Sequence, residues 1–192
     1  MEIVFATGNP HKLEEINEIL STVKMSKNIE FVLPNKDFNP VENGSNFEEN
    51  SYIKAKEANR VTGKISLADD SGLCVEALNG APGLFSARYA GTQTEKINKL
   101  LKELEPHQNR KAKFVCVMTL LDENGEILHI SKGECEGQIA KTQSGKNGFG
   151  YDPVFLVKGR DKTMADMDEN EKNLISHRGK ALRDMLVFID SL

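Results

Sequence analysis

The stretch Ile65-Ser66-Leu67-Ala68-Asp69-Asp70-Ser71-Gly72 joins a short apolar run to two adjacent carboxylates. The run predicts a buried strand, and Gly72 predicts a sharp backbone turn directly after the acidic pair. Like charges repel, and near an apolar strand they also lose hydration, so the pair indicates a bound cation or a shared proton. Carboxylate oxygens are typical ligands of Mg²⁺. An ordinary Asp-Asp-Ser-Gly turn, whose side chains cap local amides, is the alternative that this stretch alone leaves open.

A second polar segment, Thr7 to Lys12, follows the apolar run Ile3 to Ala6. This order predicts a strand, a turn at Gly8 and then a helix, because Pro10 suits the first helical turn. Free amides at a helix start, a glycine that permits close approach and Lys12 one turn in favour an anion site. The Walker A spacing is absent from the segment. The candidate phosphate-binding residues are Thr7, Gly8, Asn9 and Lys12.

The remaining chain alternates predicted strands and helices and then forms a hairpin. The predicted elements are the strand Ile29–Leu33, the loop Pro34–Asn43, a helix from a capping box at Ser45–Glu48 to about Val61, a short strand Leu73–Ala77, the helix Glu95–Glu105, the strand Phe114–Leu121, its return strand from Glu126, and the helix Ser176–Leu192. This order predicts an α/β fold with a mixed central sheet flanked by helices. We expect a single bilobed domain over residues 1–192, with an active-site cleft between the lobes.

Composition narrows the class of protein. The 192 residues carry a formal net charge of −4, which argues against a dedicated nucleic-acid binder but is compatible with a nucleotide ligand. The three cysteines are widely spaced and form no C-x-x-C pair, so neither a disulfide framework nor a zinc cluster is indicated. The chain starts with a strand pattern instead of a signal peptide and has no apolar run long enough for a bilayer. The sequence therefore predicts a soluble, cytoplasmic protein with no membrane or nucleic-acid partner.

Two further polar segments lie downstream, Gly148 to Pro153 and Lys172 to Gly179. Each has a purely structural alternative: the first as a glycine-proline turn anchored by aromatics, the second as a helix start with Ser176 as its N-cap. His177 stands next to Arg178, which makes it a better candidate for ligand recognition than the isolated histidines elsewhere.

In this order and spacing, the four segments resemble the inosine triphosphate pyrophosphatase family, also called XTP/dITP diphosphatases, over essentially the whole chain. The matching motifs are Thr7-Gly8-Asn9 with Lys12, Phe47 with Glu49-Asn50, Ala68 to Leu73, Gly80 to Gly83 with Ser86 to Arg88, Gly148 to Pro153, and Ile175 to Gly179. Ser51 departs from the family pattern, in which alanine often follows Phe-x-Glu-Asn, and this is a small-for-small change. The resemblance implies hydrolysis of inosine, deoxyinosine and xanthosine triphosphates to the monophosphate and pyrophosphate, with Mg²⁺ and usually as a homodimer.

The resemblance also implies roles for individual residues. Glu42 and Asp70 would bind the metal, with Asp69 as a further candidate ligand, and Asp70 would activate the attacking water. Glu42 stands in a loop, so its approach to the metal is either direct or through water. The implied substrate contacts are Thr7 to Lys12 for the triphosphate, Ser71, and, for the base and phosphates, Phe149, Gly150, Tyr151, Asp152, Lys172, His177 and Arg178.

The predicted function is therefore Mg²⁺-dependent removal of deaminated purine nucleotides from the nucleotide pool. One alternative is a related house-cleaning pyrophosphatase for other modified nucleotides, and Phe149, His177 and Arg178 count against it. Another is a nucleotide-binding module without turnover, which the acidic pair and Glu42 disfavour because binding alone needs no activated water. Donors near Arg178 would favour 6-oxo bases over adenine, whose amino group would leave them unpaired.

Overall fold

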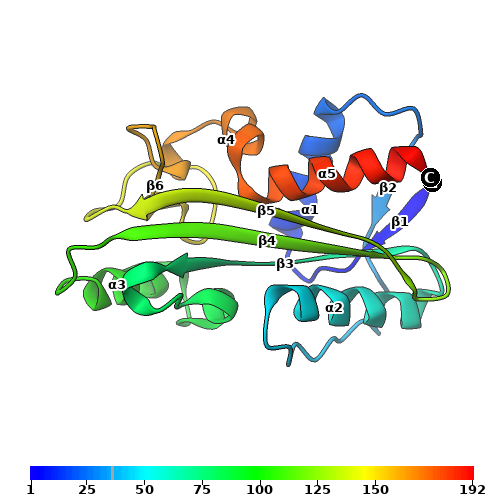
Figure 1. The fold of residues 1–192 in the computed structure, drawn as a ribbon, viewed down its shortest axis with the longest axis horizontal. Helices are drawn as coiled ribbons and strands as arrows, with labels where there is room; N and C mark the ends of the chain where they lie inside the picture. Colours follow the sequence, from blue (N-terminus) through cyan, green and yellow to red (C-terminus); the bar gives the residue numbers. More distant parts are fainter. Residues whose placement is uncertain (36) are drawn as a thin grey trace. The chain divides into compact units, whose positions relative to one another are not determined.

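A six-stranded sheet forms the centre of the fold, with the strand order β2-β1-β3-β4-β5-β6 (Figure 1). The computed structural model describes residues 1–35 and 37–192; Lys36, in the predicted loop Pro34–Asn43, lies outside the described residues. β1 pairs in parallel with β2 and β3, whereas β5 and β6 are antiparallel, so the predicted mixed sheet is confirmed. The strands are β1 Glu2–Phe5, β2 Glu30–Val32, β3 Ser66–Val75, β4 Lys111–Leu121, β5 Ile127–Ile139 and β6 Phe155–Val157.

Of the five α-helices in the described residues, four match predicted helices, and the helix Glu169–Ile175 was not predicted. They are α1 Pro10–Thr22, α2 Phe47–Thr62, α3 Gln93–Glu103, α4 Glu169–Ile175 and α5 His177–Ser191, with short 3₁₀ turns at Glu76–Leu78, Gly83–Arg88, Asp152–Val154 and Met164–Asp166. None of the helices in the described residues combines the length and apolar character that crossing a membrane requires. The chain divides into two compact units, unit 1 (residues 1–70, 116–133 and 178–192) and unit 2 (residues 71–115 and 134–177).

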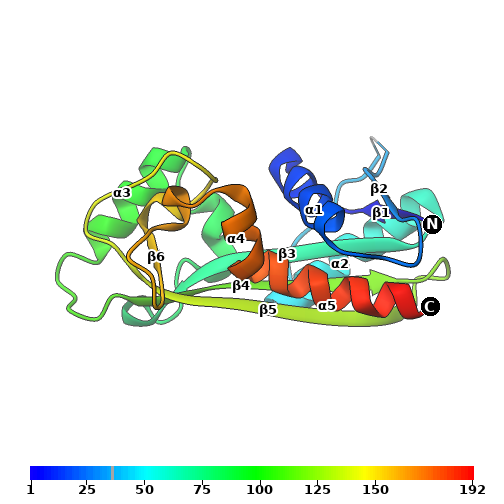
Figure 2. The ribbon, with the colours of Figure 1, turned by 90° about the horizontal axis from the view of Figure 1, so that it is seen from above.

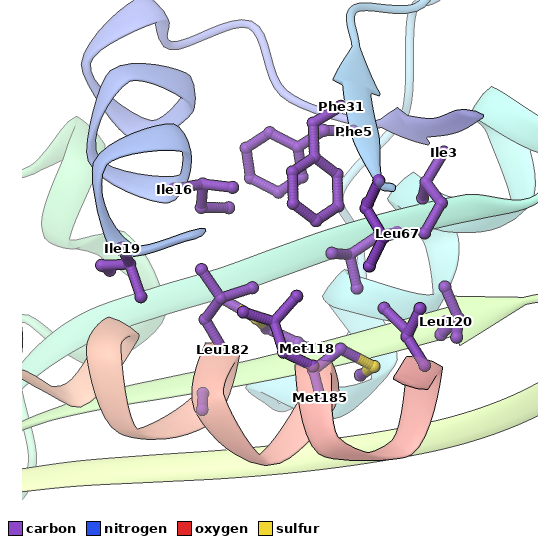
Figure 3. Close-up of a cluster of buried hydrophobic side chains, with 14 of the residues drawn as sticks. Ile3, Phe5, Ile16, Ile19, Phe31, Leu67, Met118, Leu120, Leu182 and Met185 are labelled. Carbon is purple, nitrogen blue, oxygen red and sulfur yellow. The ribbon is translucent and has the colours of Figure 1, made fainter. Parts of the chain in front are cut away.

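In unit 1, α1 and α5 cover one face of the sheet and α2 covers the other (Figures 1 and 2). Successive strand residues point to opposite faces, so alternate positions supply the two cores. The first core joins Ile3, Phe5 and Leu67 to Ile16 and Ile19 of α1 and to Leu182 and Met185 of α5 (Figure 3). The second core contains Val4, Ala6 and Ala68 together with Ala55 and Ala58 of α2. Its small side chains let α2 lie close to the strands.

The start of α2 differs from the prediction by one residue. The N-cap is Asn46, whose side chain accepts a hydrogen bond from Glu49 N at 2.8 Å, instead of Ser45 with Glu48. Glu49 Oε2 accepts from Ser45 N at 2.7 Å, one residue before the N-cap, so the predicted capping box Ser45–Glu48 is wrong. Both serine and asparagine are good caps, and the local hydrogen bonds decide between them.

The predicted turn at Gly72 is wrong, and so is the separate strand Leu73–Ala77. β3 runs without interruption from Ser66 to Val75, straight through the acidic pair. β1 stops at Phe5, however, and pairs with β3 only as far as Leu67. Asp69 and Asp70 therefore stand where β3 extends past the end of its parallel neighbour, which explains why polar residues occur within a long strand.

In unit 2, α3 packs on the strand residues Leu73 and Val75 through Ile97, Leu100 and Leu104. The same core includes Phe114 of β4, Phe155 of β6 and residues of the short 3₁₀ turns. Phe114 and Phe155 contact each other with ring centroids 4.6 Å apart. This core holds the downstream glycine-rich segment, because Tyr151 and Val154 belong to it.

Candidate active site

The first polar cluster lies beyond the carboxyl end of β1, beside the middle of its parallel neighbour β3. Phe5 pairs with Leu67, and Ala6 N donates to Leu67 O at 2.7 Å. This register brings the turn that begins at Thr7 level with Asp69, although the two are more than sixty residues apart in sequence. Ligands commonly bind at this edge of α/β sheets, and the structure brings together the two segments that the sequence analysis singled out.

Side-chain hydrogen bonds hold the turn between β1 and the start of α1. Asn9 N donates to Thr7 Oγ1 at 3.0 Å, and the Asn9 side chain accepts from His11 N at 3.1 Å. Pro10 occupies the first helical turn, as predicted. An added Cβ on Gly8 would meet no atom within 4 Å, so this side of the turn is open. An open helix N-terminus of this kind offers amides and a positive dipole end to an anion.

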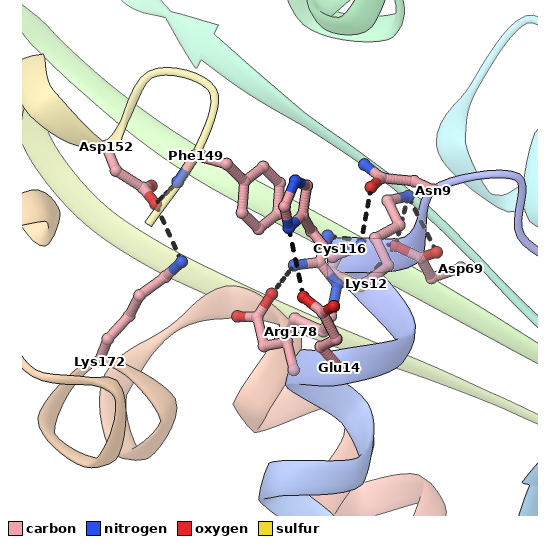
Figure 4. Close-up of polar contacts among 11 residues, drawn as sticks. Asn9, Lys12, Glu14, Asp69, Cys116, Phe149, Asp152, Lys172 and Arg178 are labelled. Carbon is pink, nitrogen blue, oxygen red and sulfur yellow. Dashed lines mark hydrogen bonds and ion pairs between the residues drawn. The ribbon is translucent and has the colours of Figure 1, made fainter. Parts of the chain in front are cut away.

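Asp69 belongs to a buried charge cluster between β3, α1 and α5. Its carboxylate accepts from Lys12 Nζ at 2.8 and 2.9 Å and lies 3.4 Å from Arg178 Nη2 (Figure 4). Arg178 Nη1 also donates to Glu15 of α1. Arg178 is only 2% exposed and Asp69 1%. The two acidic and two basic groups, Asp69, Glu15, Lys12 and Arg178, sum to zero charge.

The pKa values in this cluster follow from burial and charge together. Burial alone would raise the pKa of Asp69, but Lys12 and Arg178 lower it well below its usual range. Burial would lower the pKa of Arg178, yet Glu15 and Asp69 raise it. Cys116 lies 4.0 Å from Asp69, and burial together with that carboxylate raises the pKa of its thiol. Asp69 is therefore a stably ionised anchor, and Cys116 is a neutral thiol.

Asp70 faces the opposite side of the sheet, because adjacent strand residues alternate. Its Oδ1 accepts from Lys54 Nζ of α2 at 2.7 Å, and the same ammonium lies 3.2 Å from Glu42 Oε2. Burial raises the pKa of Asp70 despite this contact, which places it closer to the range of a working base. Burial would lower the pKa of Lys54, but Asp69, Asp70 and Glu42 raise it, so the ammonium is charged.

The Glu42–Asp70 pair fits a Mg²⁺ site, because its ligand atoms are carboxylate oxygens. Two carboxylates from different segments converge on one cation, and their charge exceeds that of Lys54 by one unit. No group of three potential ligands among His, Cys, Asp and Glu occurs in the described residues. Mg²⁺ needs no such group, since it binds through one or two carboxylates plus substrate phosphates and water. Asp69, by contrast, is turned to the other face and is neutralised by Lys12 and Arg178.

A second polar cluster lies within unit 2 and centres on Asp152. The Asp152 Oδ2 atom accepts from Phe149 N at 2.9 Å and from Lys172 Nζ at 2.9 Å (Figure 4). Lys172 Nζ also lies 4.8 Å from the centroid of the Phe149 ring, a cation–π distance. Gly148 has a φ of 72°, and a Cβ there would stand 2.1 Å from Asp152 Oδ2. The loop is therefore wrapped closely around one carboxylate.

The other predicted residues of unit 2 are held by the core. Tyr151 Oη donates to Ser86 O at 2.9 Å, and Ser86 Oγ accepts from Leu73 N at 2.9 Å. The motif around Ser86 thus anchors the glycine-rich segment to β3. His177 is buried and stacks on Phe114, with centroids 4.7 Å apart and planes 11° from parallel.

The predicted site residues divide between the two units, each of which is a coherent cluster. Unit 1 holds Thr7, Gly8, Asn9, Lys12, Glu42, Asp69, Asp70 and Arg178, and unit 2 holds Ser71, Phe149, Gly150, Tyr151, Asp152, Lys172 and His177. Their substrate contacts and the cleft between lobes stay predictions.

Two charged residues were not predicted from the sequence, Lys54 and Glu15. Both lie in the buried stripe of an amphipathic helix, beside Ala55 in α2 and Ile16 in α1. A charge at such a position needs a buried counter-charge, and that requirement was the available signal. Lys54 joins Glu42 to Asp70, and Glu15 holds Arg178.

Comparison with known proteins gives whole-chain matches. A protein named dITP/XTP pyrophosphatase from Coxiella burnetii is 47% identical, covering 96% of this chain and 94% of the relative. A second protein of that name, from Prochlorococcus marinus, is 45% identical over 94% of this chain and 90% of its own.

Solved structures agree with these sequence matches. The structure of a HAM1 protein from Coxiella burnetii has a TM-score of 0.89 at 44% identity and covers 100% of both chains. The Staphylococcus aureus Ham1 protein has a TM-score of 0.87 at 39% identity, covering 100% of this chain and 99% of that one. A sequence model described as the Ham1 family matches residues 3–188. Fold, motifs and matches extend over the same residues, and this chain belongs to the Ham1 family.

Proposed function

We propose that this protein is a nucleoside triphosphate pyrophosphatase that hydrolyses deaminated purine nucleotides, ITP, dITP and XTP, to the monophosphate and pyrophosphate. The observation that carries the proposal is the Glu42–Lys54–Asp70 arrangement at the sheet edge that also bears the open start of α1. Relatives named dITP/XTP pyrophosphatase support the substrate class.

The residues of unit 1 supply what phosphoryl transfer requires. Asp70 holds the attacking water and takes its proton on a carboxylate oxygen, and its raised pKa suits that task. The start of α1 and Lys12 provide donors and positive charge for phosphate oxygens. Mg²⁺ held by Glu42 and Asp70 would neutralise charge on the reacting phosphoryl group. We propose no metal ligand role for Asp69, whose carboxylate instead fixes Lys12.

The residues of unit 2 supply base recognition in this proposal. Phe149 presents a flat ring for stacking a purine, and Lys172 adds positive charge beside it. Asp152 fixes both by accepting their hydrogen bonds. Selectivity for 6-oxo bases would come from donors that adenine cannot satisfy.

A panel of nucleoside triphosphates, incubated with the pure protein and Mg²⁺, tests the proposal when pyrophosphate and orthophosphate are measured separately. We expect pyrophosphate and a monophosphate, with ITP and XTP preferred strongly over ATP and GTP. Release of orthophosphate would make the protein a γ-phosphatase and refute the mechanism. ATP hydrolysis as efficient as ITP hydrolysis would favour a related pyrophosphatase, and no turnover would favour a binding module.

Two properties implied by the family resemblance complete the proposal, a cytoplasmic location and a homodimeric state. Light scattering coupled to size-exclusion chromatography measures the molar mass directly, and a value near 21.3 kDa would refute the dimer.

A further inference from the structure

The Lys54 ammonium contacts both carboxylates that a metal ion would need. Its ammonium lies 2.7 Å from Asp70 Oδ1 and 3.2 Å from Glu42 Oε2, and the residue is only 8% exposed. These are the two carboxylates that we propose as Mg²⁺ ligands. The ammonium thus donates to Asp70 and forms an ion pair with Glu42, the two residues whose carboxylate oxygens would coordinate the ion. A divalent cation on those oxygens would stand close to a fixed positive charge and be repelled by it.

The charge distribution around β3 indicates that a metal ion can replace the Lys54 ammonium beside Glu42 and Asp70. On the α1 face, the two negative charges of Asp69 and Glu15 are equalled by the positive charges of Lys12 and Arg178, with which they pair. On the α2 face, Glu42 and Asp70 share the single positive charge of Lys54 and keep one negative charge in excess. Added cations are therefore attracted to the α2 face, where the Lys54 ammonium already contacts both carboxylates.

We infer that Lys54 is a built-in counter-cation of the metal site, which holds the Glu42–Asp70 pair until Mg²⁺ displaces its ammonium. The inference rests on the proposed function, because it takes that pair as the metal site. It goes beyond that function in assigning to Lys54 the control of metal affinity. Mg²⁺ binding to the free protein is weakened by the cost of moving the ammonium. A polyphosphate that accepts the displaced ammonium lowers that cost, so metal and substrate promote each other's binding.

Mg²⁺ titration of the nucleotide-free protein by calorimetry tests the inference with Lys54→Met, which removes the charge and keeps the length of the side chain. We expect the variant to bind Mg²⁺ at least about tenfold more tightly than the wild type. The matched control is Lys56→Met, two residues along α2, whose exposed ammonium donates to Gly125 O at 3.0 Å. Its Mg²⁺ affinity should equal that of the wild type. A Lys54→Met protein that binds Mg²⁺ no more tightly than the wild type overturns the inference.

Thermal unfolding provides a second readout. It remains usable even if Lys54→Met is unfolded without Mg²⁺. Without its counter-cation the carboxylate pair repels, so Lys54→Met should unfold at a lower temperature than the wild type in EDTA. Mg²⁺ should raise its Tm by more than it raises that of the wild type, at an ionic strength matched with NaCl. If the variant is unfolded in EDTA, recovery of its circular dichroism on adding Mg²⁺ is the equivalent result. A Tm gain no larger than that of the wild type, or no recovery, contradicts the inference.

Neither readout requires turnover, so the two proposals can fail separately. Wild-type protein that makes pyrophosphate from ITP, together with unchanged Mg²⁺ affinity in Lys54→Met, would refute only the role of Lys54. Tighter Mg²⁺ binding in the variant, together with no pyrophosphate from the wild type, would refute only the proposed reaction.

Discussion

Asp69 and Asp70 are chemically identical neighbours with different surroundings. One contacts Lys12 and Arg178 on the α1 face, and the other contacts Lys54 on the α2 face. The same substitution should therefore have different consequences at the two positions, which makes the pair a controlled comparison within one strand.

Asp70→Asn should keep the fold and lose turnover. The amide is a poor base and a poor Mg²⁺ ligand, and loss of a general base commonly costs about 10²- to 10⁴-fold in rate. Steady-state kinetics with ITP measures the effect, and denaturant unfolding checks that stability is kept. A near-normal kcat in the folded variant would remove Asp70 from the mechanism.

Asp69→Asn should instead lose stability. It leaves Lys12 and Arg178 with reduced compensation in a buried cluster, and breaking a buried ion pair typically costs about 3–5 kcal/mol. Urea unfolding compared with Asp70→Asn measures the difference. Equal unfolding free energies for the two variants would contradict the separate roles.

At this scale the sequence predicted which polar segments lie near one another in unit 1 better than what each side chain contacts. Glu42, Asp70 and Lys12 were singled out, and the structure places all three at the β1–β3 edge or in contact with it. The opposed faces of the acidic pair were missed, because the predicted strand ends at Ala68 and its alternation does not extend to the two residues that follow. Arg178 was expected at the base, and its two buried carboxylate partners could not be foreseen without knowing that α5 returns to α1.

Among the elements, the loop from Gly148 to Asp152 depends most on backbone conformation. Its glycine at position 148 has φ 72° and has no room for a Cβ beside Asp152. Because Asp152 holds both Phe149 and Lys172, displacement of this carboxylate would move both groups together.

Gly148→Ala should therefore raise KM for ITP by about tenfold or more, since small displacements of binding groups cost up to about 10²-fold. Gly159→Ala is the matched control, because Gly159 has φ 76° and open space around its missing Cβ. It carries the same backbone strain, about 1 kcal/mol, and should leave KM unchanged. Equal KM values for the two variants would show that the contact between the loop and Asp152 is unimportant.

Element positions were largely predictable, and element ends were not. Periodicity located α1, α2, α3 and α5, because their apolar stripes face the three cores. The start of α2 moved by one residue, since Ser45 and Asn46 are competing caps. β3 passed through its glycine, because pairing with a neighbouring strand outweighs a local turn preference.

For the whole molecule, the interleaved units were the least predictable feature. Unit 1 is assembled from three segments and unit 2 from two, so no contiguous stretch of sequence marks either of them. The single domain over residues 1–192 stays a prediction. The mixed sheet was predictable from the order of strands and helices, whereas the crossing points at residues 70–71, 115–116, 133–134 and 177–178 lie inside or beside regular elements and leave no linker signal.

Global stability should fall in acid. Several carboxyl groups have a pKa lowered in the folded protein, Asp69 most strongly, with Glu49, Glu57, Asp122, Glu136, Asp166 and Asp190 at the surface. A lowered folded pKa means that the unfolded chain takes up protons first, at about pH 4. The stabilisation is thus complete above that pH and is lost as pH falls toward the folded values.

Urea unfolding at intervals from pH 7 to pH 3 measures this dependence. We expect little change down to about pH 5 and a steep decline below pH 4. Asp70, with its raised pKa, takes up protons first in the folded state and acts in the opposite direction, so the decline of Asp70→Asn in acid should be at least as steep as that of the wild type. An unfolding free energy that stays constant to pH 3 would contradict the assigned shifts.

The alternation of Asp69 and Asp70 across β3 also limits how this segment can change in length. Inserting or deleting one residue between Ser66 and Asp70 would exchange the two faces of everything beyond it, sending one carboxylate to the partners of the other. Single substitutions can be tolerated in this segment of β3, but insertions and deletions of one residue cannot. A library of single-residue indels should show a sharp gap in surviving variants over this strand, and tolerance should return at the exposed residues 105–109 between α3 and β4.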